Sequence, residues 1–103
     1  MIFRIWRGWT KSAGGADAYE ALLQTKILPE LQGIDGHEGA YVLRRRVEGG
    51  VEFMVLTMFD SMDAVRAFAG ADPGVANISP EARALLSDFE KEAAHYETVV
   101  RPA

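Results

Sequence analysis

Residues 38–60, EGAYVLRRRVEGGVEFMVLTMFD, decide the fold of this chain. Two runs rich in β-branched, aromatic and aliphatic side chains flank the pair Gly49-Gly50. A glycine pair between two such runs predicts a β-hairpin, because a two-residue primed turn needs positive φ values that glycine adopts without cost. With these glycines as the turn, we expect Arg46 to lie opposite Phe53.

Neither face of this predicted ribbon is polar along its length. One face carries Ala40, Val42, Arg44, Arg46, Phe53, Val55, Thr57 and Phe59. The other face carries Tyr41, Leu43, Arg45, Val47, Glu52, Met54, Leu56 and Met58. An antiparallel ribbon with one wet face alternates apolar and polar residues, so this ribbon needs cover on both sides. We expect the chain's own helices on one side and a second copy of the protein on the other.

The sequence before the hairpin predicts a strand, a loop and a broken helix. Residues 2–9 are expected to form the strand, and the Gly- and Ser-containing residues 11–16 the loop. Asp17 is expected to begin the helix, with Glu20 three residues later as in a capping box. Pro29 falls inside the helical pattern, and proline removes a backbone donor and clashes with the preceding turn. We therefore expect a kink or break just before it.

The sequence after the hairpin predicts two further helices. The first is expected to be capped by Asp60 or Ser61, and Gly70 is expected to stop it. Ser79 is a cap for the second, because proline and glutamate follow it in the first turn. The apolar spacing of this second helix continues as far as Phe89.

A last strand is expected over residues 94–101. The order strand, helix, strand, strand, helices, strand is the split βαβ pattern of a ferredoxin-like fold. Such an α+β sandwich places its helices on one face of a four-stranded antiparallel sheet. A length of 103 residues fits one domain of this kind, spanning residues 1–103.

Composition narrows the classes of function. The formal net charge is −4, and the one tight basic cluster, Arg44-Arg45-Arg46, would alternate across a strand, so we expect no nucleic-acid partner. No apolar run approaches the ~20 residues that span a bilayer, and the N-terminus lacks the features of a signal peptide. Cysteine is absent, which removes thiolate chemistry and fits a cytoplasmic protein.

Three residues carry the chemical hypotheses. His95 can exchange a proton near neutral pH, either as a base toward a phenol or as a histidine satisfied at the sheet edge. Arg4 shares a strand face with Trp6, and a buried arginine needs a partner. That partner is either Glu97 in a structural ion pair or the anion of a ligand. Trp6 either lines an aromatic pocket or packs in the core.

Metal and phosphate sites are not expected. His37 lies in a glycine-rich link with Asp35 and Glu38, but a metal site needs three or four converging ligands, and the two histidines are far apart in sequence. The chain has no nucleophile elbow, phosphate loop or dinucleotide fingerprint. We therefore predict no metal and no cofactor.

The chain resembles the antibiotic biosynthesis monooxygenase-like domains of the dimeric α+β barrel superfamily. The resemblance covers nearly the whole chain and rests on the order and spacing of short pieces. These pieces are Ile2, Arg4, Trp6 and Gly8; Asp17 to Tyr19; Gly36; Leu43 to Arg45; Phe59 to Ser61; Phe68 to Gly70; Ser79 to Glu81; and His95 to Glu97.

This resemblance implies a homodimer in which two sheets pack face to face, with a pocket in each subunit between sheet and helices. It also implies a cofactor-independent monooxygenase acting on an aromatic or phenolic molecule. We assign His95 as its base and Arg4, Trp6, Phe59 and Phe68 to substrate binding.

The alternatives are a non-catalytic binding or stress-response dimer, a purely oligomeric domain, and a haem-degrading relative. Haem-degrading relatives use an Asn–Trp–His set, which this chain does not reproduce: Trp6, Phe68 and the neighbourhood of Asn77 stand at those places.

Overall fold

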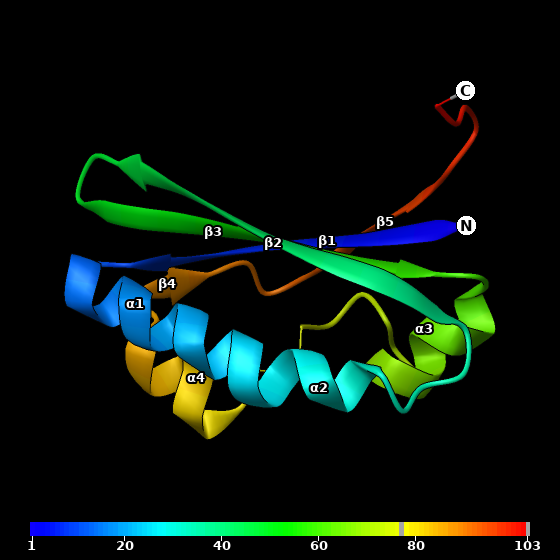
Figure 1. The fold of residues 1–103 in the computed structure, drawn as a ribbon, viewed down its shortest axis with the longest axis horizontal. Coiled ribbons are helices and arrows are strands. Elements are labelled where there is room, and N and C mark those ends of the chain that lie inside the picture. Colours follow the sequence, from blue (N-terminus) through cyan, green and yellow to red (C-terminus); the bar gives the residue numbers. More distant parts are fainter. Residues whose placement is uncertain (77, 103) are drawn as a thin grey trace.

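The computed structural model describes residues 1–76 and 78–102. They form an antiparallel sheet with its helices packed on one face (Figure 1). The elements are β1 (Ile2–Thr10), α1 (Ala13–Leu22), the π-helical turn η1 (Leu23–Ile27), α2 (Leu28–Leu31), β2 (His37–Val47), β3 (Gly50–Phe59), α3 (Met62–Ala69), α4 (Pro80–Leu85), β4 (Asp88–Phe89) and β5 (Ala94–Glu97). The ferredoxin-like α+β class predicted from the sequence is confirmed.

The sheet order is β2-β3-β1-β4, and β5 also pairs with β1. The place of the fourth strand is therefore taken by two short strands that share one edge of β1, and only β5 lies within the residues predicted as a strand. β4 pairs at Gly8 and Trp9, and β5 pairs from Ile2 to Ile5. The predicted strand over residues 94–101 ends earlier than expected, at Glu97.

The hairpin register differs from the prediction by two residues. Arg46 pairs with Val51 rather than Phe53, and the turn consists of Glu48 and Gly49. Gly50 belongs to β3, where a Cβ atom would lie 2.0 Å from the backbone oxygen of Thr10. Gly50 is thus needed for a close approach of two strands. A shift of two residues keeps every side chain on its predicted face.

The first helix begins earlier than predicted. α1 starts at Ala13, and the Ser12 hydroxyl accepts a hydrogen bond from the backbone N–H of Gly15 at 3.0 Å. The expected loop over residues 11–16 is therefore confirmed only for residues 11 and 12 and is wrong for residues 13–16, because a serine cap outweighs two glycines in the first turn. Near Pro29 the helix widens into the π-turn η1 and continues into α2.

The last helix ends sooner than predicted. α4 stops at Leu85, and Phe89 lies in β4. The backbone N–H groups of Ser87 and Glu90 donate to the carbonyl oxygens of Trp9 and Arg7 at 2.8 and 2.9 Å. The free edge of β1 thus takes hydrogen bonds that a longer helix would have kept within itself. The Ser61 and Ser79 caps and the stop at Gly70 are as predicted.

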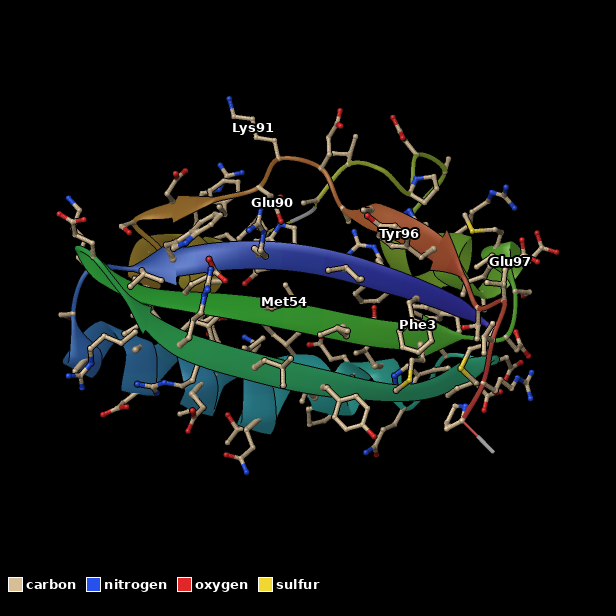
Figure 2. The ribbon with its side chains drawn as sticks, turned by 90° about the horizontal axis from the view of Figure 1, so that it is seen from above. Phe3, Met54, Glu90, Lys91, Tyr96 and Glu97 are labelled. Atoms are coloured by element: carbon tan, nitrogen blue, oxygen red, sulfur yellow. The ribbon has the colours of Figure 1, made fainter. Side chains whose placement is uncertain are left out.

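The two faces of the sheet have different cover. On the helix face the side chains of Phe53, Phe59 and Thr10 are almost completely buried. On the other face no described helix packs, and Tyr41, Leu43 and Tyr96 are exposed (Figures 1 and 2). None of the described helices has the length and apolar character needed to cross a membrane.

Candidate functional site

A cavity of about 90 Å³ lies between the sheet and its helices. β1 and β3 form its floor, and α1, η1, α2, α3 and the residues before α4 form its walls. Its main apolar lining residues are Trp6, Leu23, Ile27, Leu28, Leu31, Val55 and Phe68. Its polar lining residues are Arg4, Tyr19, Thr57 and Ser79. The cavity is smaller than the ~150 Å³ that holds a benzene ring, so a larger ligand must displace side chains.

The π-turn supplies much of the apolar wall. In η1 the backbone N–H of Leu28 donates to the carbonyl of Leu23, five residues earlier. Pro29 has no backbone N–H to donate, so one α-helical hydrogen bond cannot form here, and the wider turn accommodates its loss. It places Leu23, Ile27 and Leu28 along the cavity. Single π-turns occur often at functional sites, and here the proline in the sequence is the cause.

Arg4 is the charged group at this cavity. Its side chain comes from β1 on the helix face, and the residue is only 9% exposed. Its Nε is buried without a hydrogen-bond partner, and its guanidinium carbon lies 5.4 Å from the ring centre of Phe68. Burial lowers the pKa of Arg4 from its ordinary value. A cation on an aromatic face gains some stabilisation, but less than a carboxylate would give.

The predicted ion pair between Arg4 and Glu97 is wrong. Glu97 lies opposite Ile2 in the sheet and is exposed. Within residues 1–76 and 78–102, no carboxylate forms a salt bridge with Arg4. Of the two alternatives raised by the sequence, the structural ion pair is therefore excluded, and the anion-binding one remains.

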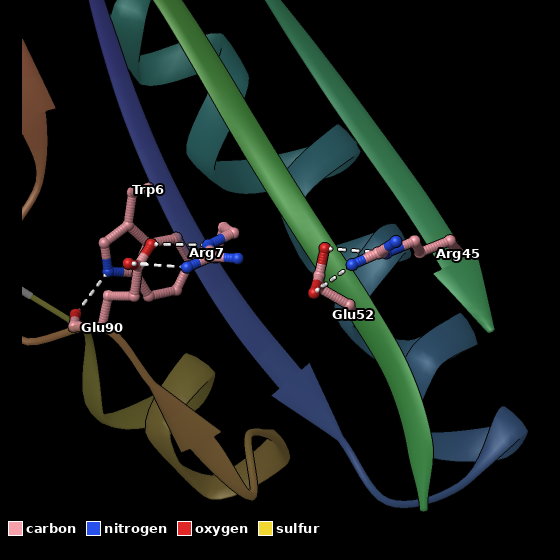
Figure 3. Close-up of polar contacts among 5 residues, drawn as sticks. All are labelled: Trp6, Arg7, Arg45, Glu52 and Glu90. Atoms are coloured by element: carbon pink, nitrogen blue, oxygen red, sulfur yellow. Dashed lines mark hydrogen bonds and ion pairs between the residues drawn. The ribbon is translucent and has the colours of Figure 1, made fainter. Parts of the chain in front are cut away.

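Trp6 both packs in the core and lines the cavity. Its Nε1 donates to the backbone carbonyl of Glu90 at 2.7 Å (Figure 3), and its ring lies 6.5 Å from that of Phe89. The backbone of Glu90 thus fixes the Trp6 ring, and its carboxylate pairs with Arg7. The indole therefore presents a fixed apolar surface to the cavity.

Phe68 and Phe59 lie one behind the other. Phe68 lines the cavity, and its ring stacks on that of Phe59 with centres 5.8 Å apart. Phe59 is completely buried and stands behind this lining. Direct contact with a ligand is therefore available to Phe68, whereas Phe59 supports it from behind.

His95 lies beside Arg4. The two residues are directly opposite each other in the β1–β5 pairing. His95 is half-buried, and its Nε2 is shielded from solvent without a hydrogen-bond partner. Burial, and after it the nearby charge of Arg4, lowers the pKa of His95. The imidazole is therefore kept neutral and able to accept a proton at neutral pH, although it stands next to the cavity lining rather than in it.

Sequence reasoning missed Tyr19 and Thr57. Tyr19 is 2% exposed, its ring meets Phe53 edge-on at 4.9 Å, and burial raises the pKa of its hydroxyl. Thr57 donates weakly, at 3.5 Å, to the carbonyl of Arg4. Both were visible as polar residues among apolar neighbours on the helix face. Tyr19 shares the buried face of α1 with Ala16, a residue that the sequence placed in the loop before this helix.

The other histidine does not belong to this site. The ring of His37 meets Phe59 edge-on at 5.8 Å, at the irregular start of β2. Across the described part of the chain, no three His, Asp or Glu side chains come close enough to hold a metal ion. Asn77, considered above for a haem-type set, lies outside the described residues.

Known structures share this architecture. The haem-degrader MhuD of Mycobacterium tuberculosis, with two haems bound in its active site, has 19% identity and a TM-score of 0.67 over 100% of both chains. An antibiotic biosynthesis monooxygenase proposed for Deinococcus radiodurans has 15% identity and a TM-score of 0.65, covering 100% of this chain and 97% of that one. This chain has the antibiotic biosynthesis monooxygenase fold. The resemblance stated from the sequence is thus confirmed at the level of fold.

A third structure with this fold holds a bound ligand. The monooxygenase from the ActVA-Orf6 gene of Streptomyces coelicolor, in complex with nanaomycin D, has 16% identity and a TM-score of 0.59. The match covers 99% of this chain and 92% of that one. No family model and no curated protein matches the sequence. At such identities the likeness establishes the fold, and function has to be argued from the site.

Proposed function

We propose that this protein is a cofactor-independent monooxygenase that oxidises a small aromatic or phenolic molecule in the cavity beneath the sheet. The observation that carries the proposal is an apolar, aromatic-lined cavity that ends at a buried cation beside a neutral histidine. Proteins with this fold include monooxygenases, one of them in complex with nanaomycin D. The substrate itself stays open.

The proposed chemistry uses dioxygen as co-substrate. His95 stands next to the cavity lining, and we place it within reach of the ligand once the cavity has widened to admit that ligand. It then takes a proton from an activated CH₂ or hydroxyl group, which leaves a carbanion or phenolate. This anion gives one electron to dioxygen, and the resulting radical and superoxide combine in a C–O bond. Protonation gives a hydroperoxide, and loss of water from it leaves a carbonyl. Overall a CH₂ group and O₂ become C=O and H₂O. Trp6 and Phe68 hold the ring system flat against the sheet.

Oxygen consumption tests this proposal. The protein is incubated with an anthrone, and dioxygen uptake is measured together with the anthraquinone product. We expect uptake to fall at least ~100-fold in His95→Gln, the range that general bases supply. The matched control is His37→Gln, which removes the chain's other histidine. If His95→Gln consumed oxygen at the wild-type rate, the base assignment would be wrong.

Haem is the second candidate ligand, because the likeness to the haem-degrader MhuD covers the whole chain. Against it stands the cavity volume of about 90 Å³, which requires a large opening before a porphyrin can enter. A titration followed by haem absorbance separates the two ideas. Saturable binding at one or two haems per chain would favour haem over a phenolic molecule as the ligand. Ligand-dependent stabilisation without turnover would favour a binding module.

We also propose that the protein is a homodimer in which a second copy of the chain covers the outer face of the sheet. We place this homodimer in the cytoplasm. The outer face exposes Tyr41, Leu43 and Tyr96, and contiguous apolar surface of this kind marks contact sites. Its main charges are already neutralised in pairs, Arg7 with Glu90 and Arg45 with Glu52 (Figure 3). Sedimentation should give twice the monomer mass, and Leu43→Lys should raise the dimer dissociation constant at least ~100-fold. A well-folded wild-type monomer at micromolar concentration would refute the dimer.

A further inference from the structure

The cavity holds a cation that the protein leaves without a counter-ion. Among the described residues that line it, Arg4 is the only one that carries a full charge. The titratable groups nearby are the Tyr19 hydroxyl in the lining and His95 on the neighbouring strand. Neither supplies a negative charge at neutral pH, because burial raises the pKa of Tyr19 and His95 is a base.

This arrangement differs from that of three other arginines on the sheet, and the remaining one, Arg46, is exposed to solvent. Arg7, Arg44 and Arg45 each have at least one carboxylate partner at 3.1 to 3.3 Å. Arg4 is the most deeply buried of the five arginines on the sheet and has no carboxylate partner among the described residues. A buried charge is normally paired, because desolvation without a partner is costly. The group that would complete the site is therefore an anion brought by the ligand.

We infer that the cavity selects ligands by an oxyanion, the phenolate or enolate oxygen of an aromatic ring, and that Arg4 is the residue that sets this preference. The ring lies among Trp6, Phe68 and the π-turn side chains, and the oxygen accepts hydrogen bonds from the guanidinium. This inference deepens the proposed function, because it names the substrate class of the same cavity. A neutral aromatic of equal size gains the apolar contacts but leaves Arg4 uncompensated.

The inference has a spectroscopic consequence. A guanidinium in a poorly hydrated cavity favours the ionised form of a phenol beside it, so the pKa of the bound phenol falls. 4-Nitrophenol reports this directly, because its anion absorbs visible light and its neutral form does not. Its methyl ether, 4-nitroanisole, has the same ring and cannot ionise. The two probes therefore share one aromatic ring and differ in whether they can carry a negative charge.

The test measures the affinity of both probes for wild-type protein, Arg4→Gln and Arg4→Lys, with Arg7→Gln as control on the same strand. We expect the wild type to bind the phenolate about 10- to 100-fold more tightly than the ether, the range of a charge-assisted hydrogen bond. The pKa of bound nitrophenol should fall by about one unit or more. Arg4→Gln should abolish both effects, Arg4→Lys should keep part of them, and Arg7→Gln should leave them unchanged.

Other outcomes overturn the inference. Equal affinity for the two probes, a preference that survives in Arg4→Gln, or no saturable binding of the phenolate up to millimolar concentration would each refute it. Circular dichroism of each variant excludes unfolding as the cause of a lost signal. The proposed function fails separately: a phenolate preference without oxygen uptake would keep the ligand class and reject the oxygenase. Oxygen uptake that is unchanged in Arg4→Gln would keep the oxygenase and reject Arg4 as the residue that sets the ligand preference.

Discussion

Arg4 and Arg7 stand three residues apart on β1 and face opposite sides of the sheet. Arg7, on the uncovered face, makes two hydrogen bonds of 3.2 and 3.3 Å to the Glu90 carboxylate and lies 5.5 Å from the Trp9 ring. The hydrogen bond and charge of Glu90 raise the pKa of Arg7. Arg4, on the covered face, is buried without a carboxylate. The exposed arginine is thus the satisfied one, and the buried arginine is not.

The contrast extends to the two faces as wholes. On the uncovered face Arg45 also pairs with Glu52, at 3.1 and 3.2 Å, and its hydrogen bond lowers the pKa of that carboxyl. Partnered charges there sit beside apolar residues such as Phe3, Met54 and Tyr96 (Figure 2). On the helix face the described core is apolar, and Arg4 is the charged residue that lines its cavity. The outer face thus carries paired charges among apolar side chains, whereas the inner face carries a cavity with an unpaired cation.

The largest expected effect tests which face holds the fold together. Phe53→Ala removes a completely buried ring and should lower the free energy of unfolding by about 3–5 kcal/mol. Met54→Ala, one residue along on the uncovered face and half-buried, should cost about 1 kcal/mol or less in the monomer, since part of its surface is already wet. Urea unfolding at low protein concentration measures both. Similar losses for the two variants would contradict the division between the faces.

A smaller effect, of opposite sign for the two arginines, tests the comparison itself. Arg4→Met removes an unpartnered buried charge and keeps the apolar stem, so the ligand-free protein should become more stable by roughly 1 kcal/mol. Arg7→Met breaks a half-exposed ion pair and should cost about 0.5 kcal/mol. Thermal unfolding of both variants provides the measurement. A stability loss in Arg4→Met equal to that of Arg7→Met would mean that the Arg4 charge is structurally satisfied.

Much of the fold was readable because local signals agreed with one another. The hairpin, the Ser61 and Ser79 caps and the Gly70 stop were all predicted, and each depends on residues close in sequence. The errors fall where a distant segment decides. The backbone of Thr10 lies so close to residue 50 that only glycine fits there. Residues 87–90 continue a helical sequence pattern, but they form hydrogen bonds with the edge of β1 instead. Tertiary hydrogen bonds of this kind cannot be predicted from the residues nearby in the sequence.

The site was readable in part for the same reason. Strand alternation placed Arg4 and Trp6 on one face, and both line the cavity. It could not show that Glu97 lies opposite Ile2 and is exposed, because pairing register depends on where the last strand begins. Nor could it show the π-turn whose residues close the cavity. The anion-binding hypothesis for Arg4 therefore gained its support from the structure.

The smallest expected effect concerns His95 and its dependence on pH. The pKa of folded His95 lies below its ordinary value of about 6.5 because of burial and the opposing Arg4 charge. The unfolded chain therefore binds this proton more tightly than the folded protein does, and acid favours unfolding. Stability carried by neutral His95 is present above pH ~7 and is lost as the pH falls through ~6.5 toward the folded value.

His95→Gln lacks this loss of stability. The difference in melting temperature, wild type minus His95→Gln, should therefore decrease as the pH is lowered from 8 to 5. All other titrating groups are common to the two proteins and cancel in the difference. The double variant with Arg4→Met should show a smaller change on losing His95, because one of the two causes of the shift has gone. A difference that stayed constant across this range would mean that the histidine is as accessible to protons in the folded protein as in the unfolded chain. That result would argue against our proposal that His95 is a shielded base beside the cavity.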